Sequence, residues 1–168
     1  MAAGVQAIRA ERLARTLGVS KGSFYWHFAD LPALHTAMLG HWEALATEQV
    51  IGATDSAGGN ARVRLTLLMD IATSDRSDAY GGLATEAAIR DWARHDPAAA
   101  KILGRVDTRR QDYVAGLFKE AGLAPGSATR ATRLLYAALV GTEHLLQSPR
   151  EQVRQDLQHL LTKLLLPD

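Results

Sequence analysis

The sequence predicts an all-α protein, with an N-terminal helix-turn-helix head followed by a helical bundle. The 168 residues are rich in Ala, Leu and Arg, which favour helices, and they contain no β-branched run of the kind that forms strands. Apolar residues recur every three or four positions along several segments. Hydrophobic residues make up 47% of the chain, which is enough for a substantial core. We expect a head over residues 1–30 and a body over residues 31–168.

Composition excludes several classes of protein. The chain has no cysteine, so it has no disulfide, thiolate metal site or thiol nucleophile. We expect no membrane span, because no apolar run reaches 18 residues, and no signal peptide, because the first residues lack a basic and then apolar pattern. The Glu-x-x-His, His-Glu-x-x-His and phosphate-loop patterns are absent. We therefore expect a cytoplasmic protein that is not an enzyme, with no catalytic residue, cofactor or metal.

The stretch from Leu13 to Phe28, LARTLGVSKGSFYWHF, has the layout of a helix-turn-helix. A first helix is predicted over residues 6–15 and a second over residues 20–26. Gly18 lies between them, where the chain must reverse and glycine reaches left-handed backbone angles without strain. Ser20 is a good N-cap for the second helix.

The second helix presents an unusual number of hydrogen-bond donors and flat rings. Such a short helix is typical of one that lies in the groove of a duplex. The charge distribution agrees, because the first 28 residues carry four basic and one acidic group, while the other 140 carry 15 basic and 17 acidic groups. Arg9 is a further phosphate-contact candidate. The predicted DNA-binding residues are Arg12, Ser20, Lys21, Ser23, Tyr25, Trp26 and His27.

The segment LGVSKGSFYWHFADLPAL resembles the recognition-helix signature of the TetR family of transcriptional regulators. The resemblance covers residues 4–39 well and the rest only in helix order. It implies a homodimeric regulator, most often a repressor, that binds double-stranded operator DNA and responds to a small-molecule effector. Family members carry one more helix before this motif, so we expect the head of this chain to lack it. Leu31 also replaces the Lys or Arg with which relatives contact phosphate.

The body is predicted to contain a long connector helix over residues 32–51, with Asp30 as its cap, and a linker over residues 52–60. Further helices are expected over residues 61–74, 83–94, 97–121 and 125–147. Asn60 and Asp96 are predicted N-caps, and Gly122 a C-terminal cap. Ser148, Pro149 and Glu151 form a predicted capping box for the last helix.

Two further sites follow from the resemblance. Aromatic residues with a polar edge suit an apolar effector pocket, and the candidates are Trp42, Met69, Trp92, His95, Tyr113, Phe118 and His144. The last two helices would pair with their copies in a dimer, through Leu135, Leu139, Thr142, Leu146, Leu157, Leu160 and Leu164. The alternative hypothesis is a helical small-molecule-binding dimer that does not bind DNA, because the head lacks its first helix.

Overall fold

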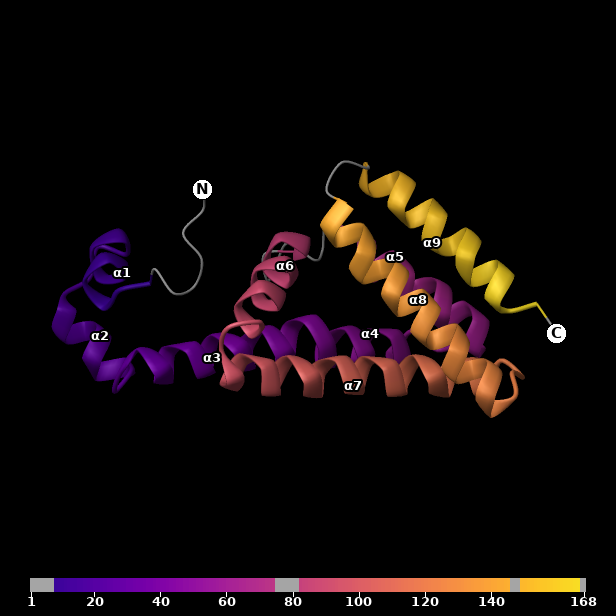
Figure 1. The fold of residues 1–168 in the computed structure, drawn as a ribbon, viewed down its shortest axis with the longest axis horizontal. Coiled ribbons are helices and arrows are strands. Elements are labelled where there is room, and N and C mark those ends of the chain that lie inside the picture. The colour runs from indigo at the N-terminus through magenta and orange to yellow at the C-terminus, as the bar shows by residue number, and fades with distance from the viewer. Residues whose placement is uncertain (1–7, 75–81, 146–148, 167–168) are drawn as a thin grey trace.

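The computed structural model describes residues 8–74, 82–145 and 149–166, and throughout these residues it is helical, with no strand. A head stands at one end of a long rod, and the body gathers around the other end (Figure 1). The elements are α1 (Ala10–Thr16), α2 (Lys21–His27), α3 (Leu31–Glu43), the π-helical segment η2 (Ala44–Glu48), α4 (Gln49–Ser56), α5 (Ala61–Thr73), α6 (Gly82–Ala93), α7 (Pro97–Glu120), α8 (Pro125–Leu145) and α9 (Arg150–Leu164).

The predicted all-α fold is confirmed, and the predicted caps explain where several helices begin. The Asp30 carboxylate accepts a hydrogen bond from the backbone N–H of Ala33 at 2.8 Å, and the Asn60 side chain accepts one from Val63 at 3.1 Å. Asp96 likewise accepts from the two N–H groups at the start of α7. Each cap satisfies donors that the first helical turn leaves without a partner.

The connector is longer than the sequence predicts. Helix α3, η2 and α4 form one continuous rod from Leu31 to Ser56, so residues 52–56 are helical rather than part of a linker. The turn that follows contains only Ala57, Gly58 and Gly59 before the Asn60 cap. Gly58 and Gly59 adopt φ values of +69° and +87°, which favour glycine and stop the helix.

The last helix also begins differently from its prediction. Helix α9 starts at Arg150, with Pro149 as a cap residue that makes no side-chain hydrogen bond. The Glu151 carboxylate accepts hydrogen bonds from Arg154 and Gln155 on the next turn. Ser148 lies outside the described residues, and so do residues 75–81, which make up most of the break predicted between the helices over residues 61–74 and 83–94.

Three apolar clusters hold the molecule together. The largest joins α5, α7, α8 and α9, and a second packs the C-terminal half of α3 against α6 and α7. The third lies in the head and includes Leu34 of α3, so the first turn of the connector belongs to the core of the head. No described helix is both long enough and apolar enough to cross a membrane.

Candidate nucleic-acid interface

A small core fixes the angle between the two helices of the head. Ala10 of α1, Phe24 of α2 and Leu34 of α3 are buried together, and Phe28 and Leu31 pack against them. Gly18 closes α1 with φ +67°, and the N–H of Val19 reaches back to the carbonyl of Ala14 at 2.9 Å. This is a Schellman ending, in which a left-handed residue reverses the chain. The predicted turn at Gly18 is therefore confirmed.

Leu31 takes part in this core because the head needs an apolar residue where α2 meets α3. It is half-buried against the cluster and does not extend toward solvent. Phe28 is also half-buried there. Both side chains pack against the cluster that contains Phe24, on the side of the head where α2 meets α3.

The opposite face of α2 is strongly exposed. The Trp26 side chain is 82% exposed, and Tyr25 and His27 are also open to solvent. The Trp26 and His27 rings meet edge to face, with centroids 4.6 Å apart. Exposing a large indole costs free energy unless something covers it, so this face has the character of a binding surface.

Lys21 at the start of α2 is held by a neighbour. Its Nζ lies 2.6 Å from Oε1 of Glu11 on α1, and it is 5.9 Å from the centre of the Tyr25 ring. The hydrogen bond to Glu11 raises the pKa of Lys21, and the same bond lowers the pKa of Glu11. Both side chains are more than half exposed, so solvent screens the pair and the lysine can exchange Glu11 for another anion.

The other predicted DNA-binding residues have mixed positions. Arg12 is exposed on α1, which packs against α2. The Ser20 hydroxyl accepts a hydrogen bond from the backbone N–H of Ser23 at 3.1 Å, which confirms its predicted role as a cap. Ser23 itself is half-buried, so it is less open to a ligand than Tyr25 or Trp26.

The structure does not bring the predicted effector-pocket residues together. Met69 and Phe118 are buried in the large cluster of α5, α7, α8 and α9, whereas Trp42 and Trp92 are buried in the cluster of α3, α6 and α7. These side chains fill the cores because large apolar groups gain most from complete burial.

The remaining candidates are also separate. His95 is exposed in the turn after α6, and the Tyr113 hydroxyl donates a hydrogen bond to Asp55 at 2.6 Å. The side chain of His144 lies outside the described part of the chain.

A buried polar network lies where the rod meets α6 and α7, and sequence analysis missed it. The Glu86 carboxylate accepts hydrogen bonds from Trp42 Nε1 at 3.0 Å and from Arg110 Nη2 at 2.8 Å. Arg110 also donates to the Thr47 hydroxyl at 2.9 Å and to the Ala46 carbonyl at 3.1 Å. Burial opposes the charge of Arg110, but the Glu86 carboxylate more than offsets this and raises the pKa of the guanidinium.

A second group of polar residues extends the network to α8. Arg90 forms a two-point ion pair with Asp107, with distances of 2.9 and 3.0 Å. The Tyr136 hydroxyl donates to Asp107 at 2.7 Å and accepts from Arg90 at 3.1 Å. Burial raises the pKa of Tyr136 to about 12, with Asp107 acting in the same direction and Arg110 against it.

The available sequence signal for these residues was their spacing. Glu86 and Arg90 stand four apart, and Asp107 and Arg110 three apart, so each pair shares a helix face with buried apolar residues. Charges on an apolar face are costly unless they pair, which predicts partners across the helices.

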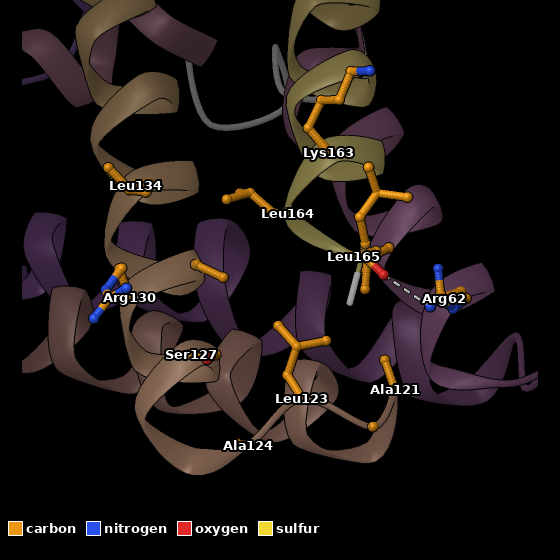
Figure 2. A pocket seen from close by; sticks show the side chains of 13 residues that line it. Arg62, Ala121, Leu123, Ala124, Ser127, Arg130, Leu134, Lys163, Leu164 and Leu165 are labelled. Atoms are coloured by element: carbon orange, nitrogen blue, oxygen red, sulfur yellow. Dashed lines mark hydrogen bonds between the residues drawn. The ribbon is translucent and has the colours of Figure 1, made fainter. Parts of the chain in front are cut away.

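A hollow of about 530 Å³ lies at the end of the body farthest from the head. Its lining residues come from the end of α9, the start of α5, α8 and the turn from α7 to α8 (Figure 2). Leucines from α8 and α9, among them Leu134 and Leu164, face this space, and Arg62, Arg130 and Lys163 surround it. Arg62 donates to the carbonyl of Leu165 at 3.0 Å and so caps the end of α9.

The residues predicted for a dimer interface divide into two groups. Leu135 and Leu157 are buried in the cluster of α5, α7, α8 and α9, where they pack against the other helices of the chain. Leu139, Thr142, Leu160 and Leu164 are only partly buried on α8 and α9. Leu146 lies outside the described residues. The described part also contains no group of three His, Asp or Glu side chains that could hold a metal ion.

The fold and the exposed helix together define a helical protein that carries a helix-turn-helix head on a connector rod. No family model and no curated protein matches the sequence. Among solved structures, it is similar to that of a proposed TetR-family transcriptional regulator from Rhodococcus sp., with a TM-score of 0.81 and 21% identity over 97% of this chain and 90% of that one.

It is also similar to a proposed transcriptional regulator from Pseudomonas aeruginosa PAO1, with a TM-score of 0.73 and 22% identity over 96% of this chain and 82% of that one. These TM-scores establish a shared fold. The resemblance to the TetR family that the sequence indicates is therefore confirmed at the level of the fold.

Proposed function

We propose that the protein is a transcriptional regulator that binds duplex DNA as a homodimer through α2 of each copy. The observation that supports it most directly is the exposed face of α2, where Lys21, Tyr25 and Trp26 lie on a helix held rigidly from behind by Phe24. A lysine at the start of such a helix reaches phosphates or guanine edges, and aromatic rings contact phosphates or thymine methyl groups.

Two copies are part of the proposal, because one short helix reads few base pairs. A dimer places two recognition helices about 34–36 Å apart on one side of the duplex, so it reads a palindrome. The partly buried leucines of α8 and α9 and the exposed Leu134 beside them supply an apolar surface for the second copy.

The proposal includes control by a small-molecule effector, with repression in its absence. An effector that binds the body better in one conformation than in another shifts the population of head orientations. The rod is the element that transmits such a shift, because it packs against α6 and α7 in the body and against Phe24 in the head.

The test is selection of duplexes from a random library by the purified protein, followed by titration of the selected sequence over a range of salt concentrations. We expect selective binding whose affinity falls steeply with salt. Tyr25→Ala should weaken binding by about tenfold while the oligomeric state and helix content stay unchanged. Lys119→Ala, an exposed substitution on α7, is the control and should bind normally.

If the protein is folded and dimeric but selects no duplex, the proposal that it is a transcriptional regulator is refuted. The better account would then be a helical small-molecule-binding dimer. Selective binding that Tyr25→Ala leaves intact would instead show that α2 is not the surface that contacts the DNA.

A further inference from the structure

The connector rod contains a π-helical turn that its local sequence does not require. In the segment Ala44–Glu48, ALATE, the rod widens, and the N–H of Gln49 bonds to the carbonyl of Ala44, five residues back. The segment has no Pro or Gly, and Ala, Leu and Glu are strong α-helix formers. Isolated π turns inside α-helices are rare and occur often at functional positions. Contacts from outside the rod must therefore impose this one.

Those contacts join residues that stand five apart on the rod. Glu43 and Glu48 pair with Arg105 and Arg109, which are four apart on α7. In an unbroken α-helix, residues five apart point about 140° away from each other, so one α7 face could not pair with both. The π turn inserts one residue and returns both glutamates to the same face.

The buried network follows the same five-residue spacing. Trp42 donates to Glu86, and Thr47, five residues on, accepts from Arg110. Glu86 and Arg110 are bonded to each other, so the two rod residues must face one side. The π turn makes this possible.

The rod also carries a second apolar face, displaced by one residue. After the π turn, the buried positions are Thr47, Ile51 and Thr54, with exposures of 1%, 7% and 0%. A continuous α-helix from Trp42 would instead turn Ala46, Val50 and Ala53 toward the core. In the structure Ala46, inside the π turn, is already buried, whereas Val50 is half-buried and Ala53 is exposed. Both faces are free of charged residues, so both registers can pack.

Arg110 contacts the rod at the two groups that distinguish these registers. It donates to the Thr47 hydroxyl and to the Ala46 carbonyl, both inside the π turn. Shifting the register by one residue rotates α4 by about 100° and removes the Thr47 hydroxyl from the guanidinium. Gly58 and Gly59, at the end of α4, give the chain freedom to accept that rotation.

We propose that the π turn is a register switch in the connector, which Arg110 holds in the π form and which relaxes to a continuous α-helix when Arg110 is withdrawn. Helix α3 carries the head, and α4 packs on α5 in the body. The switch therefore changes the rotation of the head relative to the body. Any ligand that draws the Arg110 guanidinium away from Thr47 would release it. The effect on DNA binding rests on the proposed function, but the switch itself does not.

The absence of cysteine makes the register measurable by thiol reactivity. We compare two variants that each carry a single cysteine. Ala53→Cys places it at an exposed position, and Thr54→Cys places it at a buried one. With Arg110 in place, the first variant should react with a maleimide much faster than the second, because a buried thiol is protected. In the α register this order is reversed, because Ala53 turns inward and Thr54 outward.

The switch is released by Arg110→Met combined with Glu86→Gln, so that no carboxylate is left buried without its guanidinium partner. We expect the ratio of the two reaction rates to change by about tenfold or more, with the order inverted. Thr47→Val, which removes only the hydroxyl acceptor, should change the ratio in the same direction by a smaller factor.

Two controls separate the switch from general loosening. Arg109→Met removes an exposed ion pair to Glu48 from the same face of α7 and should leave the order unchanged. Deletion of Ala44 places Trp42 and Thr47 four apart, so a continuous α-helix keeps both native faces. In that background the Arg110→Met and Glu86→Gln changes should no longer invert the order.

An unchanged order after the Arg110→Met and Glu86→Gln changes would overturn the proposal. So would rapid reaction at both positions, because that result means that α4 melts rather than changes register. None of these measurements uses DNA, so their failure is distinguishable from failure of the proposed function.

Discussion

Lys21 is the residue of the exposed α2 face that depends most on a neighbour. The bond to Glu11 is short, at 2.6 Å, yet both side chains are solvated. The ion pair therefore orients Lys21 but leaves it able to bind another anion, since exchange of one exposed anion for another costs little free energy. Glu11 also places a negative charge close to any phosphate that Lys21 would approach.

We predict that Glu11→Gln strengthens DNA binding at low salt by about threefold, because Lys21 is freed and a repulsive charge is removed. The gain should shrink as salt rises, since screening weakens both terms. The measurement is a fluorescence-anisotropy titration with a labelled duplex at two salt concentrations. The control is Glu151→Gln, which removes a carboxylate that pairs with Arg154 on α9 and should leave DNA binding unchanged. Equal affinity of Glu11→Gln and the unchanged protein at low salt would contradict the prediction.

At the scale of secondary-structure elements, polar contacts rather than apolar ones determine how the rod, α6, α7 and α8 are aligned. Trp42 and Thr47 come from the rod, Glu86 and Arg90 from α6, and Tyr136 from α8. Apolar packing is tolerant of small rotations, but hydrogen bonds to a buried guanidinium have narrow geometry. The network therefore fixes the rotation of each helix about its axis.

The free energy of unfolding at alkaline pH should depend on the ionisation of Tyr136. Its pKa is raised from 10.0 to about 12 in the folded protein, so the folded state holds its proton where the unfolded chain has lost it. The corresponding stability is complete below pH 10, and it is lost as pH rises through 12, by about 2 kcal/mol.

Tyr136→Phe should remove a large part of that alkaline loss, and at neutral pH it should cost about 1–3 kcal/mol through the hydrogen bonds to Asp107 and Arg90. Urea unfolding at neutral and alkaline pH measures both effects. Burial also raises the pKa of Tyr113 to about 12, so this residue adds an alkaline loss of its own, which Tyr113→Phe tests separately. A Tyr136→Phe protein with the full alkaline loss would show that this hydroxyl ionises freely.

At the scale of the whole molecule, head and body are arranged at opposite ends of one long rod (Figure 1). Among the described leucines, Leu17 is exposed in the head, and Leu134 and Leu166 are exposed at the far end of the body, beside the hollow of Figure 2. A second copy that covers this part of α8 and α9 would hide Leu134 and Leu166 from water.

We predict that Leu134→Glu yields monomers, because covering two glutamates with the partner costs the desolvation of both carboxylates and removes two apolar contacts. The Leu134 side chain is 49% exposed in one protomer, so the substitution should leave the fold of the monomer intact. Val63→Glu is the matched control, at a position on α5 that is 54% exposed. Light scattering after size-exclusion chromatography measures both. A dimeric Leu134→Glu protein would place the interface on another surface.

Several features could be predicted from the sequence because they depend on neighbours along the chain. The turn at Gly18 and the caps Ser20, Asp30 and Asn60 all lie as expected, since a cap bonds to amides two or three residues away. Solvent exposure at Tyr25 and Trp26 was also predictable, because the pattern of α2 gives Phe24 to the core.

The effector-pocket residues could not be predicted in the same way. Aromatic side chains such as Trp42 and Phe118 suit a protein core as well as a ligand pocket. Only the packing of distant helices shows that both lie in the core of the chain. The same holds for Leu135 and Leu157, which the helical period marks as apolar without saying which neighbour covers them.

The sequence by itself determined the all-α class, the helix-turn-helix and the polar face of its second helix, because periodicity, caps and turns act over a few residues. The tertiary structure alone decided the π turn and the network around Glu86 and Arg110. The segment Ala44–Glu48 is locally a good α-helix, and only contacts from α6 and α7, some forty to sixty residues away, shift its register.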